Sequence, residues 1–109
     1  MNVKELQKLF KKSTEENILF DEPHISQRCK ENNLTKEQVV YTLLHETTKL
    51  THFIEDRAKV YKLYFQLTKK RQLKVIIDLL TYKRIMIRTV KILDKRFSRN
   101  TTLIKKKRH

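Results

Sequence analysis

Residues 61–67 read YKLYFQL and residues 73–79 read LKVIIDL, and these two stretches decide the fold. Each alternates inward-facing apolar residues with mostly polar ones, which is the period of two of a half-buried β-strand. The polar residues 69–72 between them are typical of a hairpin connection. A third run, residues 84–93, is rich in the β-branched side chains that strands favour. The region therefore predicts an antiparallel meander of three strands, or four if residues 50–55 join it.

One competing interpretation uses the same residues. The i, i+3, i+4, i+7 spacing of a helix is also present, at Val60, Leu63, Tyr64 and Leu67 and again at Leu73, Ile76, Ile77 and Leu80. No Gly or Pro interrupts the region. Because β-branched residues are concentrated between 75 and 92, strands are favoured, and an all-α fold is the alternative.

Three helices are expected before the meander. Apolar residues form one stripe of an amphipathic helix that runs from residue 3 to about residue 16. Residues 18–20, Ile-Leu-Phe, are either a short strand or an apolar anchor, and a short helix from His24 to about Glu31 follows. Thr35 and Gln38 have the spacing of a capping box that opens a third helix. The expected fold class is α+β, with N-terminal helices packed on a small antiparallel sheet.

A chain of 109 residues suits a single domain. We divide it into an amphipathic helix (1–17), a core (18–97) and a basic tail (98–109). No stretch approaches the roughly 18 apolar residues of a membrane span, and no apolar block of signal-peptide type is present, so we expect an intracellular, cytoplasmic protein with no membrane partner. Cys29 is the sole cysteine, which excludes an internal disulfide, and no Cys/His pair has structural-zinc spacing.

The two halves of the chain differ greatly in charge. Residues 1–56 hold 8 Lys or Arg and 10 Asp or Glu, a net charge of −2, whereas residues 57–109 hold 18 Lys or Arg and only Asp78 and Asp94, a net charge of +16. An A/T-rich genome would raise the lysine content everywhere, but it would not remove acids from one half alone. This asymmetry predicts a polyanionic partner for the basic half.

One face of the predicted meander could meet that partner. If the odd-numbered apolar residues turn inward, the other face carries Lys62, Tyr64, Gln66, Lys74 and Asp78. Lys side chains can pair with phosphates while Tyr64 stacks on an unpaired base, which suits single-stranded RNA or DNA. The alternative for Tyr64 is packing against lysine stems on a solvated face.

The third run adds cations whichever way it faces. Arg84 and Arg88 would share one face, Lys83 and Lys91 the other, and the sequence does not say which pair joins Lys74. The nucleic-acid-binding candidates are Lys62, Tyr64, Lys74, Arg84, Lys91, Lys95 and Arg96.

His24 and Arg28 are candidates for chemistry. They lie one turn apart on the same face of the predicted short helix, where an imidazole could move a proton while the guanidinium holds a phosphate. A simple pair at the start of a helix is the alternative. None of the four histidines has a metal-like partner at i+3 or i+4, so we expect no metal site. The absence of Gly also excludes phosphate-binding loops that depend on it, and no cofactor is expected.

The order of these pieces resembles small proteins of the RelE/ParE toxin superfamily, nearest to the branch of the BrnT toxins. The resemblance rests on the His24-x-x-x-Arg28 segment, a second helix after Leu34-Thr35 and the final strand Arg84-Ile85-Met86-Ile87-Arg88-Thr89-Val90, and it covers residues 18–97. The long N-terminal helix, the basic tail and the lack of a glycine before the third strand depart from the family pattern.

The resemblance implies a compact α+β fold and metal-independent cleavage of messenger RNA, often on the ribosome, with inhibition by an acidic antitoxin. In that chemistry a ribose 2′-hydroxyl attacks the adjacent phosphate, and basic side chains stabilise the charge that develops. Ile87-Arg88 resembles the strand Ile-Arg of the BrnT group, which makes Arg88 the leading phosphate-stabilising candidate. Lys62, Lys74 and Lys91 would support it.

Three hypotheses follow. The first is a RelE-like RNA-directed toxin, either a messenger RNA endoribonuclease or an inactive relative. The second is a non-enzymatic basic nucleic-acid-binding regulator or ribosome-associated protein. The third is an interaction module whose basic surface meets an acidic protein. Growth arrest on expression would separate the first from the other two.

Overall fold

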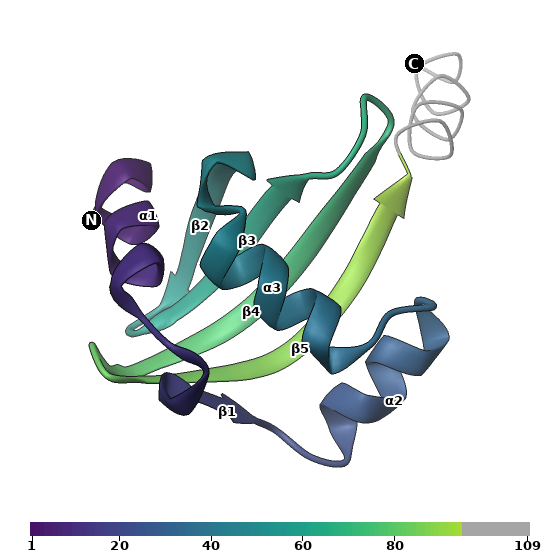
Figure 1. Cartoon of the computed structure of the whole chain (residues 1–109), viewed down its shortest axis with the longest axis horizontal. Coiled ribbons are helices and arrows are strands. Elements are labelled where there is room, and N and C mark those ends of the chain that lie inside the picture. The colour runs from purple at the N-terminus through teal and green to yellow at the C-terminus, as the bar shows by residue number, and fades with distance from the viewer. Residues whose placement is uncertain (95–109) are drawn as a thin grey trace.

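The computed structural model, which describes residues 1–94, has an α+β fold (Figure 1), and it confirms that the helices come first and pack on a sheet. The helices are α1 (Val3–Lys12), α2 (His24–Glu31) and α3 (Lys36–His45), with short 3₁₀ turns at Glu15–Asn17 and Thr47–Lys49. The strands are β1 (Ile18–Phe20), β2 (Leu50–Arg57), β3 (Val60–Gln66), β4 (Arg71–Thr81) and β5 (Arg84–Asp94). The basic tail (98–109) and the candidates Lys95 and Arg96 lie outside the described residues.

The sheet has five strands in the order β1-β5-β4-β3-β2. The meander from β2 to β5 is antiparallel, as predicted. Residues 50–55, which were the optional fourth strand, belong to β2. The meander of three to four strands is thus confirmed, with the larger of the two numbers. Residues 18–20 form β1, which pairs in parallel with β5 at Ile85–Ile87, so the sheet is mixed.

Local sequence sets the ends of the helices. Asn2 and Glu5 form a capping box at the start of α1, and Thr35 and Gln38 form the predicted one at the start of α3. The α2 helix has the predicted bounds. The α1 helix ends at Lys12, before the expected residue 16, because the backbone N–H of Ser13 bonds to the Phe10 carbonyl and Ser13 is extended. A residue whose backbone is extended in this way cannot continue the helix.

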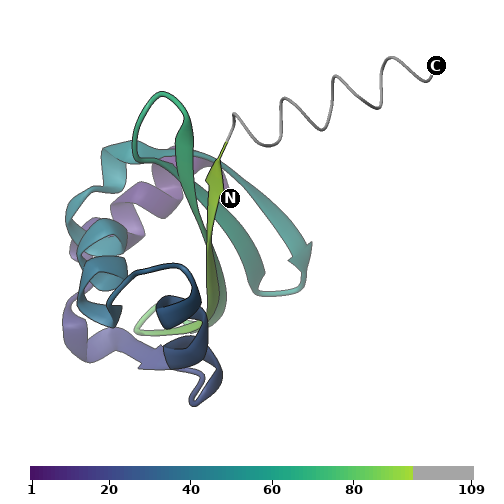
Figure 2. The same cartoon turned by 90° about the vertical axis from the view of Figure 1, so that its right-hand side faces the viewer.

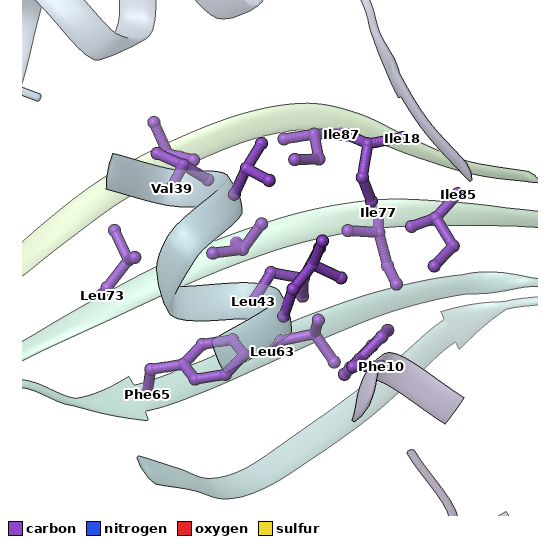
Figure 3. Packing of buried hydrophobic residues seen from close by; sticks show 14 of the residues in the cluster. Phe10, Ile18, Val39, Leu43, Leu63, Phe65, Leu73, Ile77, Ile85 and Ile87 are labelled. Atoms are coloured by element: carbon purple, nitrogen blue, oxygen red, sulfur yellow. The ribbon is translucent and has the colours of Figure 1, made fainter. Parts of the chain in front are cut away.

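One hydrophobic core lies between the helices and one face of the sheet (Figure 3). Phe10 of α1 and Leu43 of α3 are fully buried against Leu63 and Phe65 of β3. Most residues that the alternation turned inward are buried in the structure: Tyr61, Leu63, Phe65, Leu73, Val75 and Ile77. Leu67 and Leu79, at the ends of the two stretches, are only partly buried against the core. Burial of such side chains stabilises the fold by about 1.5–3 kcal/mol each.

Within residues 1–94 the helices cover one face of the sheet (Figure 2), and no helix of this part of the chain covers the other face, here called the open face. Lys62, Tyr64, Lys74 and Asp78 lie on the open face, as predicted, because their neighbours along each strand point into the core. No helix of residues 1–94 has the length and apolar character needed to cross a membrane.

A β-bulge at Arg88 decides which side chains of β5 face outward. Ile76 pairs with Thr89 while the next residue, Ile77, pairs with Ile87, so Arg88 is the additional residue. The inward positions therefore change from odd to even along β5: Ile85 and Ile87 are buried before the bulge, and Val90 after it. This shift places Lys91 on the open face, opposite Lys74.

Candidate nucleic-acid interface

The α2 helix is fixed at the β5 edge of the sheet by Asn32. β1 covers only the first part of the outer edge of β5, and further along the side chain of Asn32 takes the place of a strand. The backbone N–H of Ile92 donates to Asn32 Oδ1 at 2.9 Å, and Asn32 Nδ2 donates to the Val90 carbonyl at 3.4 Å. These two bonds hold the C-terminal end of α2 against the strand that carries Lys91.

Glu22 fixes the other end of α2. Its carboxylate accepts hydrogen bonds from the Ser26 N–H (3.0 Å), the Ser26 hydroxyl (2.7 Å) and Lys36 Nζ at the start of α3 (2.7 Å). The Lys36 ammonium, followed by the Ser26 hydroxyl, lowers the pKa of Glu22 to about 2. The carboxylate thus caps the first turn of α2, where Pro23 supplies no side-chain bond, and ties α2 to α3.

A groove of about 490 Å³ lies where α2 meets the open face of the sheet. From α2 it is lined by His24 and Arg28, and from the sheet by Lys74 and Lys91. The other lining residues are Glu31, Asn32, Ile76, Thr89 and Val90. The two groups of residues that the sequence singled out separately, the His-x-x-x-Arg pair and the cations of the meander, therefore lie in one place.

The groove keeps a positive charge although one carboxylate lies in it. Glu31 pairs with Arg28, with Nη1 and Oε1 2.9 Å apart, and both side chains are nearly half exposed, so the pair stays accessible to solvent and to competing anions. No such pair is found for Lys74 and Lys91 among residues 1–94. An anion entering the groove would meet these two ammonium groups and the guanidinium of Arg28.

The ammonium groups of Lys62, Lys74 and Lys91 repel one another. Burial, followed by the charges of Lys62 and Lys91, lowers the pKa of Lys74, while Asp56 opposes the shift. A bound phosphate would remove the repulsion among the three ammonium groups, so the cluster is better suited to a complex with an anion than to the free protein.

From the groove a row of side chains crosses the open face. Lys91 of β5 lies opposite Lys74 of β4, Lys74 opposite Tyr64 of β3, and Tyr64 opposite His52 of β2. Four neighbouring strands span about 14 Å at the usual spacing of 4.7–4.9 Å. Lys62 lies beside the row, and its ammonium is 3.8 Å from a carboxylate oxygen of Asp56.

Two of the predicted residues do not join this row. Arg84 pairs with Thr81 at the turn between β4 and β5, seven residues along β5 from Lys91, which corresponds to about 23 Å of strand. Arg88 is also absent from the groove lining. Its guanidinium pairs with Asp78 on β4 through Nη1, and its Nε lies 3.6 Å from Asp21, which follows β1.

The Arg88 pairs tie β5 to β4 and to the segment after β1. Because two carboxylates already occupy the guanidinium, Arg88 is less available to a phosphate than Arg28 in the groove. The Asp78 side chain is only 14% exposed, so it depends on this partner more than Asp21 does.

We expect Arg88→Met to destabilise the fold by about 1–3 kcal/mol, because a largely buried carboxylate of Asp78 loses its partner. Urea unfolding measures the change. Adding Asp78→Asn to that variant should recover part of the loss, since the unpaired charge is then removed. An unchanged urea midpoint in Arg88→Met would contradict a structural role for the pair.

Sequence reasoning missed His52, Asn32 and Thr89. His52 was set aside with the other histidines as an improbable metal ligand, and its pairing with Tyr64 depends on the register between β2 and β3. Cys29 is buried in the core, and burial raises the pKa of its thiol, which disfavours the reactive thiolate. Within residues 1–94 no group of three His, Cys, Asp or Glu side chains is placed to hold a metal ion.

Comparison of the chain with models of protein families, with curated proteins and with solved structures gives no match.

Proposed function

We propose that this chain binds single-stranded RNA across the open face of the sheet, from the His52–Tyr64 edge to the groove beside α2. The observation that carries the proposal is the row of His52, Tyr64, Lys74 and Lys91 on four adjacent strands, with His24 and Arg28 at its end. Aromatic rings beside a line of cations match the stacking and phosphate contacts that single strands need, and only an unpaired base is free to stack.

The charge distribution supports the same proposal. Of the 18 Lys and Arg residues in the basic half, 11 lie within residues 57–94, with only two carboxylates among them. Residues 1–56, whose net charge is −2, supply α1 and α3, which pack on the opposite face of the sheet. The resemblance to RelE-like proteins favours RNA over DNA.

A double charge reversal tests the interface. We expect Lys74→Glu with Lys91→Glu to weaken binding to a single-stranded RNA at least tenfold and to lower the salt dependence by about two phosphate contacts. Filter binding or fluorescence anisotropy at several salt concentrations measures both quantities. The matched control is Lys8→Glu with Lys12→Glu, which makes the same change in net charge on α1.

The control distinguishes a defined interface from general attraction by net charge. Since Lys8 and Lys12 lie on α1, away from the open face, reversing them should change affinity much less than reversing Lys74 and Lys91. Equal effects of the two double variants would mean that RNA has no preferred place on the molecule.

Cleavage of the bound RNA is the second candidate function, in line with the toxin activity that the resemblance implies. The observation that favours it is the presence of His24 in the same groove as Arg28 and Lys74. An imidazole can move the proton of a ribose 2′-hydroxyl, and the neighbouring cations can stabilise the charge that develops on the phosphate. In this scheme Arg28 replaces Arg88 as the main phosphate-stabilising residue.

A further inference from the structure

His52 and Tyr64 form a stacked pair of rings on the open face. Their ring centroids are 4.3 Å apart and their planes differ by 4°. The two residues lie directly opposite each other on β2 and β3. Close, nearly parallel rings on adjacent strands make a flat surface at the β2 end of the row described above.

Thr51 holds the His52 ring in place. Its hydroxyl lies 3.2 Å from the Tyr64 carbonyl, to which it donates, and 2.9 Å from Nδ1 of His52. A hydroxyl has one proton to donate, so its bond to the carbonyl leaves it as the acceptor toward His52. Nδ1 therefore carries the proton in this arrangement, and the ring is fixed at Nδ1 before any ligand arrives.

The backbone explains why Thr51 can do this. Leu50 pairs with Phe65 and His52 with Tyr64, so Thr51 is the additional residue of a bulge in β2. The bulge frees the Thr51 side chain from the regular alternation and lets it reach across to the Tyr64 carbonyl. Such irregularities redirect side chains at the edges of sheets.

One face of the stacked pair is open to a ligand. β2 is the last strand of the sheet, and His52 is exposed. On its other side, Tyr64 has Lys74 as its neighbour across the sheet. Ile54, half exposed, follows His52 on the same face of β2 and offers further apolar surface. Because His52 is exposed on the edge strand, a planar group can add to the stack at the outer face of its ring.

We propose that an unpaired nucleobase stacks on the outer face of His52 and extends the His52–Tyr64 pair to three rings. The sugar–phosphate chain then runs over Lys74 and Lys91 to the groove beside α2. This inference rests on the proposed function, because it assigns one base of the RNA to a defined place on the interface. It makes His52 the residue that distinguishes a base from a bare phosphate chain.

Two RNAs and three variants test the proposal. One RNA is a single-stranded oligonucleotide of normal bases, and the other has the same length with abasic nucleotides throughout. Removing a stacking partner typically weakens binding by about 5- to 150-fold. We expect His52→Leu to weaken binding of the normal RNA by an amount in this range, and to leave binding of the abasic RNA unchanged.

Two further variants complete the design. His52→Phe keeps a flat ring at the position and should bind the normal RNA at least as well as the wild type. Tyr82→Leu removes an aromatic ring that is 71% exposed at the turn between β4 and β5, outside the row, and should have no effect on either RNA. Thermal unfolding of each variant checks that it folds.

The outcomes separate this inference from the proposed function. If the wild type binds both RNAs equally and His52→Leu changes neither affinity, while Lys74→Glu with Lys91→Glu weakens both, the stacking site is wrong and the RNA interface stands. If His52→Leu weakens binding of the abasic RNA as much as that of the normal RNA, His52 acts through the fold and the stacking site is also wrong. If the wild type binds neither RNA, both proposals fail.

Discussion

Raising the salt concentration from about 50 to about 200 mM should weaken the binding of single-stranded RNA to this chain by roughly 300-fold or more, provided that at least six phosphates are contacted. The reason is that each Lys or Arg that meets a phosphate releases the counterion condensed there, and this release is less favourable in salt. With 18 cations in the basic half and a net charge of +16 there, six contacts need only a third of the available side chains.

A titration of affinity against salt measures the effect, and the double variant Lys74→Glu with Lys91→Glu shows where it arises. Each phosphate contact contributes about 0.7 to the slope for a single strand, so the variant should lose about 1.4 from the slope of log affinity against log salt. An affinity that stays constant across the titration would contradict a polyanionic partner. A steep slope that the double variant leaves unchanged would place the contacts outside the groove.

The fold class and the inward-facing residues could be predicted because they depend on local patterns. Alternation in residues 61–67 and 73–79 was enough to predict β3 and β4 and which of their side chains are buried. The capping box at Thr35 could also be predicted, because it depends on two side chains three residues apart. The bounds of α2 were predicted as well.

For residues 18–20 the sequence left a short strand and an apolar anchor as alternatives, and it could not decide between them. β1 is only three residues long and is a strand because it pairs in parallel with β5, more than 60 residues later in the chain. A tripeptide such as Ile18–Phe20 has no periodicity of its own. Its structure comes from the edge of β5 that it covers, and this edge exists only in the folded chain.

The candidate site depended on features that break the local patterns. Lys91 reaches the open face because the bulge at Arg88 shifts the alternation by one residue, and a one-residue shift moves every following side chain to the opposite face. The sequence placed Arg88 beside a phosphate by resemblance alone, whereas the structure pairs it with Asp78 and Asp21. Arg28 was the second choice in the sequence and is the guanidinium that lines the groove.

Removing His24 should have a large effect on any RNA cleavage and little effect on RNA binding. If the groove cuts RNA, we expect His24→Ala to slow the reaction by about 100- to 10,000-fold, because a positioned side chain that moves a proton contributes that much. Arg28, Lys74 and Lys91 remain in the groove to contact phosphates, so the affinity for RNA should stay close to that of the wild type. Single-turnover cleavage of a labelled RNA and a parallel binding assay measure the two quantities.

Arg28 and Arg88 then show whether the groove is the place of the reaction. Arg28→Ala should slow cleavage by about 100- to 1,000-fold, since it removes a donor to the developing charge. Arg88→Ala should act mainly on stability, through the loss of its pairs with Asp78 and Asp21, so its cleavage rate should stay near that of the wild type at temperatures where the variant is folded. A folded Arg88→Ala variant that binds RNA but cannot cut it, together with active His24→Ala and Arg28→Ala variants, would move the reaction from the groove to the Arg88 bulge. A wild-type chain that neither cuts RNA, on or off ribosomes, nor arrests growth would exclude cleavage and leave RNA binding as the function of the open face.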